Sequence, residues 1–190
     1  WSACYSSKRK LLYVADYCNH RIQVFQPDGT FVRAFGSQGN GNLQFQYPAS
    51  ICIGSDEVIY VADSYNHRVV LLSADDSFLG AIGVGQINCP YGICLGPDGT
   101  IYVTNQTQSA IQVFARDGSL LRTIGSKGSG VGQMNNPLAV QVGPDNLLYV
   151  ADCSNHRIQV FEVNIADSHD KESNQFTFKS KRLLGSPGAS

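Results

Sequence analysis

The stretch LLYVADYCNHRIQVF occupies residues 11–25 and decides the fold, because close copies of it recur along the chain. Its core YVAD occurs at 13–16, 60–63 and 149–152, with YVTN at 102–105, so the intervals are 47, 42 and 47 residues. A period of this length is typical of arrays in which each repeat supplies four strands. The repeat therefore indicates a set of similar small sheets rather than one continuous sheet.

Each repeat divides into four short strands. The Tyr-Val strand follows a short apolar run and precedes another, IQVF at 22–25 in the first copy, and a last run such as FVRAFG at 31–36 ends at glycine. Runs of β-branched and aromatic residues favour strands over helices, and turn sequences such as Pro27-Asp28-Gly29 separate them. We expect an all-β fold without helices, made of four four-stranded antiparallel blades at about residues 1–36, 48–83, 90–125 and 137–185, the last with a polar insertion at 164–175.

The Asn-His-Arg sequence after each YVAD closely resembles the NHL repeat, and the resemblance covers nearly the whole chain in four in-phase copies. It implies a β-propeller, which usually has six blades in this family. A closed four-bladed ring and part of a six-bladed ring both remain open at this point. An arc that is not closed would leave apolar blade faces exposed and would invite self-association through them.

A polar motif repeats in three of the four copies and is interpreted as structural. An Asp that ends a strand can accept backbone N–H groups, and an Asn three residues later tolerates a left-handed conformation. The Arg that follows can pair with an Asp. A turn motif should repeat in this way, whereas a catalytic centre should not. The predicted structural residues are Asp16, Asn19, Asp63, Asn66, Asp152 and Asn155.

The turns between second and third strands also define the predicted binding surface. Aromatic and Arg side chains supply most of the binding energy in protein interfaces, and this end of the blades is rich in both. The third copy departs from the pattern, with Asn105, Gln108, Ser109 and Ala110 in place of Asp, Asn, His and Arg. The predicted binding residues are Tyr17, His20, Arg21, Tyr65, His67, Arg68, His156 and Arg157.

The composition limits the kinds of partner that we expect the chain to bind. Residues 11–163 carry seven Lys or Arg and twelve Asp or Glu, and a net charge of −5 disfavours a phosphate backbone. No stretch of apolar residues is long enough to span a bilayer.

The six cysteines form no C-x-x-C pair, which favours free, buried thiols. Equivalent histidines on packed sheets would lie about 10 Å apart, too far for shared zinc bonds of about 2 Å, so neither metal nor cofactor is predicted.

These observations predict a non-catalytic binding or scaffold module that recognises a protein, and not an enzyme. The resemblance implies target recognition of the kind found in tripartite-motif and related ubiquitin-ligase NHL proteins. Two alternatives remain: an NHL propeller that binds single-stranded RNA, and a metal-dependent enzyme similar to peptide-amidating lyases. A cytoplasmic location is expected, although the start at Trp1 leaves an extracellular one open.

Overall fold

The computed structural model describes residues 1–162. The predicted insertion at 164–175 and the last predicted strand of the fourth blade lie outside these residues. The first blade is an antiparallel sheet in chain order, with β1 (Ser2–Ser6), β2 (Leu11–Asp16), β3 (Arg21–Phe25) and β4 (Phe31–Phe35). The second has the same order, with β7 (Pro48–Ile53), β8 (Ile59–Asp63), β9 (Arg68–Leu72) and β10 (Phe78–Ile82).

The remaining two blades repeat the arrangement. Blade three contains β11 (Pro90–Leu95), β12 (Ile101–Asn105), β13 (Ala110–Phe114) and β14 (Leu120–Ile124). The described part of blade four contains β17 (Pro137–Val142), β18 (Leu147–Asp152) and β19 (Arg157–Glu162). The prediction of an all-β propeller built of similar antiparallel blades is confirmed.

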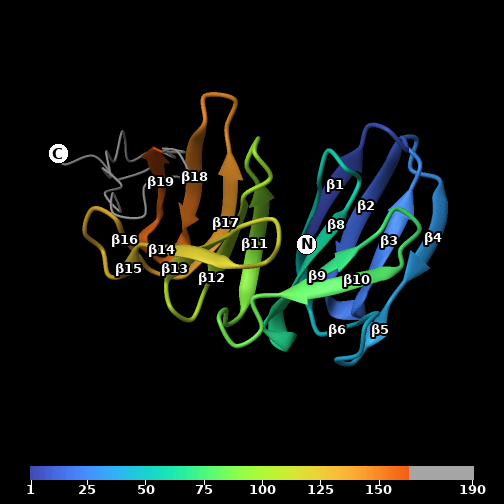
Figure 1. The fold of residues 1–190 in the computed structure, drawn as a ribbon, viewed down its shortest axis with the longest axis horizontal. Coiled ribbons are helices and arrows are strands. Elements are labelled where there is room, and N and C mark those ends of the chain that lie inside the picture. The colour runs from blue at the N-terminus through green and yellow to red at the C-terminus, as the bar shows by residue number, and fades with distance from the viewer. Residues whose placement is uncertain (163–190) are drawn as a thin grey trace.

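The first strands of the blades surround a common axis. Contacts link β1 to β7, β7 to β11 and β11 to β17, and Figure 1 shows blades one and two beside blades three and four. Side chains alternate between the two sides of each sheet, so one set packs against the preceding blade and the other against the following blade. At the first junction Tyr13 and Ile22 of blade one are fully buried against Ile59 and Val61 of blade two.

Short elements connect the blades. Two loops contain a parallel pair of two-residue strands, β5 (Ser37–Gln38) with β6 (Gln44–Phe45) and β15 (Ser126–Lys127) with β16 (Gln133–Met134). Three-residue 3-10 turns, which the sequence did not predict, join second to third strands at η1 (Tyr17–Asn19), η2 (Ser64–Asn66) and η3 (Cys153–Asn155). Within residues 1–162 no helix is long and apolar enough to cross a membrane.

Antiparallel order gives the propeller two distinct faces. The turns between second and third strands and the inter-blade loops 36–47, 83–89 and 125–136 lie at one end of the blades, here called the turn face. The connections between first and second strands and between third and fourth strands lie at the other end, here called the hairpin face.

Candidate functional site

The turn after each second strand ends at a left-handed residue in all four blades. The residue after the 3-10 turn is left-handed at His20, His67 and His156, with φ of 55°, 54° and 52°, and at Ser109 of blade three, with φ of 53°. The sequence had assigned this conformation to the Asn before each His, and the structure corrects that detail of the turn. The ring Nδ1 of His20 accepts the backbone N–H of Tyr47, and His67 Nδ1 accepts that of Cys89, both at 3.1 Å.

In blade two the polar motif closes onto the loop that precedes the blade. Asp63 is fully buried; its Oδ1 accepts the backbone N–H of Gln46 at 2.6 Å, and its Oδ2 accepts Asn66 Nδ2 at 2.8 Å. Arg68 pairs with the same carboxylate through Nε at 2.9 Å. Its other nitrogens donate to the carbonyl oxygens of Asn40, Gly41 and Gln44.

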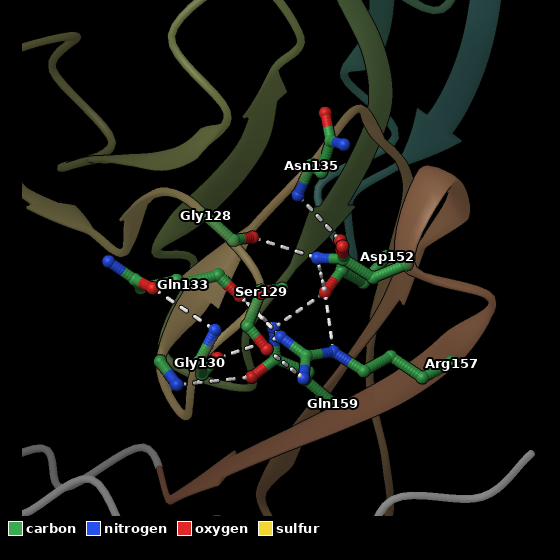
Figure 2. A network of polar contacts seen from close by, with 10 residues as sticks. Gly128, Ser129, Gly130, Gln133, Asn135, Asp152, Arg157 and Gln159 are labelled. Atoms are coloured by element: carbon green, nitrogen blue, oxygen red, sulfur yellow. Dashed lines mark hydrogen bonds and ion pairs between the residues drawn. The ribbon is translucent and has the colours of Figure 1, made fainter. Parts of the chain in front are cut away.

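Blade four repeats this set of contacts between the Asp-Asn-Arg motif and the preceding loop, here called the clasp, as Figure 2 shows. Arg157 Nε lies 2.7 Å from the buried Asp152 carboxylate, and Asp152 Oδ1 accepts the backbone N–H of Asn135 at 2.7 Å. The carbonyl oxygens of loop 128–133 accept the remaining guanidinium donors at 2.7–2.8 Å. The Asp, Asn and Arg of the motif therefore hold blades two and four to the loops before them, because every guanidinium nitrogen of Arg68 and Arg157 has an internal partner.

Blades one and three vary the clasp. In blade one Arg21 pairs with Asp16 at 2.9 Å, but its side chain is 43% exposed. In blade three neutral amides replace the charges: Asn105 Nδ2 donates to Gln108 Oε1 at 3.0 Å. The preceding loop is held there by contacts of 3.5 Å from Asn105 and Gln112 to the carbonyl of Gln86.

An aromatic cluster lies on the turn face beside these clasps. It consists of rings from three blades and the loop between blades one and two, with neighbouring centroids 4.9–6.4 Å apart: Trp1, Tyr17, Tyr47, Tyr65 and Tyr91. His20 adds an edge contact to Tyr47 at 4.5 Å. The exposed fraction is 71% for Trp1 and 47% for Tyr65, and the other rings are half-buried.

The phenol groups of the cluster converge. The hydroxyl oxygens of Tyr17 and Tyr91 are 3.2 Å apart. Burial, together with this hydrogen bond, raises the pKa of Tyr17 well above its usual range. The nearby Tyr91 phenol raises the pKa of Tyr65. Both groups are therefore neutral at physiological pH, and the cluster offers apolar ring surface together with uncharged hydrogen-bonding groups.

Charge is divided unevenly between the two faces. The turn face holds Asp16, Asp63 and Asp152, each paired with an Arg. The other acidic residues of 11–162 lie at the hairpin end: Asp28, Asp56, Glu57, Asp75, Asp76, Asp98, Asp117, Asp145 and Glu162. Most of these Asp residues accept a backbone N–H two residues later, as Asp28 does from Thr30 at 2.9 Å, so turn formation explains their positions. The acidity that disfavoured nucleic acid thus belongs mainly to the face opposite the aromatic cluster.

The structure divides the predicted binding residues into three groups. Tyr17 and Tyr65 meet in the cluster through Tyr47, and His20 contacts it as well. Arg68 and Arg157 lie within clasps, while His67 and His156 are exposed at turns. Sequence reasoning missed Trp1, Tyr47 and Tyr91, because they occupy non-equivalent repeat positions and only the radial arrangement brings them together. Aromatic residues next to the prolines that begin the first strands, as in Tyr47-Pro48 and Pro90-Tyr91, were the available indication.

The cysteines and the other side chains that could bind a metal do not gather at one place within residues 1–162. All six cysteines fall within residues 1–162 and are unpaired, with Cys94 buried and Cys18 and Cys153 exposed. In that same range no three His, Cys, Asp or Glu side chains come close enough to hold a metal ion. Cys89 and His67 form a pair, with Sγ 3.9 Å from Nδ1.

The fold and its radial clasps define a β-propeller of repeated blades. The chain belongs to the six-bladed β-propeller family, whose family model matches residues 4–99, and the NHL repeat model matches residues 134–161. The prediction of an NHL-repeat propeller is thereby confirmed. No curated protein matches the chain in sequence.

Several solved structures share the fold. A streptogramin B lyase matches with a TM-score of 0.69 at 18% identity, over 85% of this chain and 51% of the lyase. A catalytically inactive His-to-Ala variant of virginiamycin B lyase from Staphylococcus aureus, solved with quinupristin, matches with a TM-score of 0.67 at 18% identity, over 87% of this chain and 56% of that one. A Bacteroides caccae protein of unknown function matches with a TM-score of 0.64 at 16% identity, over 97% and 60%. The chain thus spans little more than half of the propellers it resembles.

These neighbours correct the prediction that the chain is not an enzyme. That prediction relied on the repetition of the polar motif and on the lack of a familiar catalytic sequence. Lyases have this same fold, so a propeller of repeated turns gives no ground for excluding catalysis. At 18% identity the likeness extends to the fold alone.

Proposed function

We propose that this propeller recognises a polypeptide partner through the aromatic cluster on its turn face. The observation that carries the proposal is the gathering of one tryptophan and four tyrosines on that face, with Trp1 and Tyr65 well exposed. Tryptophan and tyrosine dominate the energetic centres of protein interfaces. Exposed aliphatic residues on the inter-blade loops extend the apolar character of the same face: Leu43, Val84 and Val131.

Two features favour a polypeptide over single-stranded RNA. Bases need free ring surfaces on which to stack and a basic groove beside them. Here Tyr17, Tyr47 and Tyr65 pack against one another. The basic side chains of the turn face that form clasps are Arg21, Arg68 and Arg157, so they offer no row of free cations.

The test uses two equally exposed tyrosines. Tyr65 is 47% exposed within the cluster, and Tyr5 is 49% exposed on a different surface of blade one. Peptides are first selected on the intact chain from a displayed random library. Tyr65→Ala, alone and with Tyr17→Ala, should weaken binding of the selected peptides about tenfold or more, as for an interface residue worth at least about 1.4 kcal/mol, whereas Tyr5→Ala should not.

Arg68 is left unchanged in this test because its loss would open a clasp and confuse folding with binding. Equal binding by the Tyr65 and Tyr5 variants would remove the proposal. Binding of a homopolymeric RNA that weakens steeply with salt and requires Tyr65 would instead assign the face to nucleic acid.

A catalytic activity is the second candidate, and the lyases among the solved neighbours favour it. On the turn face, His67 and Cys89 form the pair in which an imidazole lies near a thiol. Quinupristin, the compound present in one neighbour's structure, provides a direct assay. Its consumption by the intact chain and not by His67→Ala, followed by liquid chromatography, would support this candidate; no consumption by either protein would count against a shared reaction.

A further inference from the structure

The tyrosine rings of the aromatic cluster form a row in which neighbours are tilted against one another. The ring centroids of Tyr17 and Tyr47 are 4.9 Å apart with an interplanar angle of 43°, and those of Tyr47 and Tyr65 are 4.9 Å apart at 56°. Tilted neighbours enclose an angle between their planes, into which a compact apolar group fits better than a flat ring. The row therefore favours a partner with small, rounded apolar groups.

Both blade junctions that position these tyrosines are complete in the described part of the chain. Tyr17 belongs to blade one, Tyr65 to blade two and Tyr91 to blade three, and Tyr47 lies in the loop that joins blades one and two. The preceding turn fixes Tyr47, because His20 Nδ1 accepts its backbone N–H at 3.1 Å. The row is thus a property of blades one to three, and it does not depend on a blade before or after them.

The cluster offers hydrogen bonds without offering charge. The hydroxyl oxygens of Tyr17 and Tyr91 are 3.2 Å apart, and a hydrogen bond between two phenols uses only one of their two protons. The second proton is left for an acceptor outside the pair. Burial, together with hydrogen bonding, raises the pKa of Tyr17, so this group donates as an uncharged hydroxyl at physiological pH.

Charged and helical partners fit this surface less well. The turns beside the cluster carry Asp16 and Asp63, and each carboxylate is paired with an Arg of its own turn. A charged side chain would therefore lose hydration at the cluster without gaining an opposite charge. In a helical partner the backbone carbonyls are already bonded within the helix, so the phenol protons would gain no acceptor from its backbone.

We infer that the polypeptide recognised by the aromatic cluster is a proline-rich segment in the polyproline II conformation; the inference rests on the function proposed above and names its partner. A polyproline II helix makes no internal hydrogen bonds, so its carbonyl oxygens are free to accept phenol protons, and its pyrrolidine rings are compact apolar groups. Two centroid steps of 4.9 Å lead from Tyr17 through Tyr47 to Tyr65, comparable in length with one three-residue turn at about 3.1 Å per residue. Because proline restricts the free segment, binding costs little conformational entropy.

Calorimetric titration of the 190-residue chain with decaproline tests the inference. A Gly-Ser peptide of equal length is the flexible, uncharged control. Decaproline should bind saturably and at least about tenfold more tightly than this control. Tyr65→Ala should weaken decaproline binding about tenfold or more, whereas Tyr5→Ala, which removes a similarly exposed tyrosine away from the cluster, should leave it unchanged.

A second variant separates the hydroxyl groups from the rings. Tyr17→Phe combined with Tyr91→Phe retains both rings and removes the hydroxyl pair, so it should weaken decaproline binding about threefold or more through the lost hydrogen bond. Its circular dichroism spectrum should match that of the intact chain, because no ring is removed.

Three results of these titrations would each overturn the inference: decaproline binding no tighter than that of the Gly-Ser peptide, equal binding by the Tyr65→Ala and Tyr5→Ala proteins, or binding unaffected by the two Phe changes. Library peptides that require Tyr65 but contain no proline-rich sequence would also overturn it and would leave the proposed function standing. Selected peptides that bind independently of Tyr65 would instead remove the proposed function, and this inference with it.

Discussion

Removing the clasp arginine of blade two should cost far more stability than removing its counterpart in blade one. The Arg68 side chain is 12% exposed, and its carboxylate partner Asp63 is fully buried. Arg68→Met would leave that charge unpaired and would remove three hydrogen bonds to the loop carbonyls. Breaking a buried pair from one side costs about 3–5 kcal/mol, and we expect a loss in this range.

Arg21→Met is the matched comparison. Arg21 is 43% exposed and contacts Asp16, which is itself partly exposed, so solvent screening limits this pair to less than about 1 kcal/mol. Urea unfolding measures both losses, and the slope of the transition checks that each variant unfolds from the same native state. A thermal scan should place Arg68→Met roughly 10 °C below the intact chain.

A double variant guards against a general defect at this position. Asp63→Asn combined with Arg68→Met removes both charges, so it should regain part of the stability that the single change loses. Equal losses for Arg68→Met and Arg21→Met, within about 0.5 kcal/mol, would refute the claim that the clasp holds the loop. A double variant less stable than Arg68→Met would refute the role assigned to the unpaired carboxylate.

Three further outcomes are expected. Hydrogen bonds from Thr30, Ser73 and Ser119 lower the pKa of Asp28, Asp75 and Asp117, so these carboxylates stabilise the fold above the ordinary pKa of about 3.9, and that stabilisation is lost as pH falls through the lowered pKa values. Replacing all three with Asn should therefore flatten the fall in Tm between about pH 5 and pH 2, and an unchanged slope would contradict this. Burial raises the pKa of Cys94 to about 12 and that of Cys52 well above its ordinary value. A thiol-reactive disulfide should therefore label the exposed Cys18 and Cys153 first and Cys94 only on unfolding, and early labelling of Cys94 in the native chain would contradict its burial. A Cβ at Gly92 would lie 2.7 Å from the carbonyl oxygen of Leu138, so Gly92→Ala should destabilise the fold by about 1–3 kcal/mol. Gly130→Ala should cost less, because the close neighbour there is the flexible end of Gln133. Equal urea midpoints for the two variants would contradict the close approach of β11 and β17.

The repeat predicted the fold because period and turn chemistry are local properties. Tyr13, Tyr60, Tyr102 and Tyr149 mark the second strand of successive blades, and each pairs with a first-strand residue. Blades two to four share a register shift after the first-strand Pro, which blade one lacks. The pairing of each Arg with the Asp five residues earlier was accessible for the same reason. Its second role, binding the carbonyls of the preceding loop, depends on how blades stack and could not be deduced from one repeat.

The aromatic cluster shows the opposite case. Tyr17 and Tyr65 were expected on the correct face, but Tyr47 lies in an inter-blade loop and Tyr91 in a first strand. No single repeat position unites them, because the distance between residues far apart in sequence is set by the radius and curvature of the ring. The net charge of residues 11–163 was misleading in a similar way. A single total did not show that most of the acidic residues lie on the hairpin face, at the opposite end of the blades from the aromatic cluster.

The neutral clasp of blade three makes the junction before that blade respond to acid differently from the junction before blade two. Protonation of Asp63 removes the charge that holds Arg68, whereas the amides of Asn105, Gln108 and Gln112 have no proton to gain in this range. Acidification should therefore release the loop that Arg68 holds before blade two, while the connection into blade three keeps its contacts. The junction whose clasp contains no charged pair would then be the one that acid leaves unchanged.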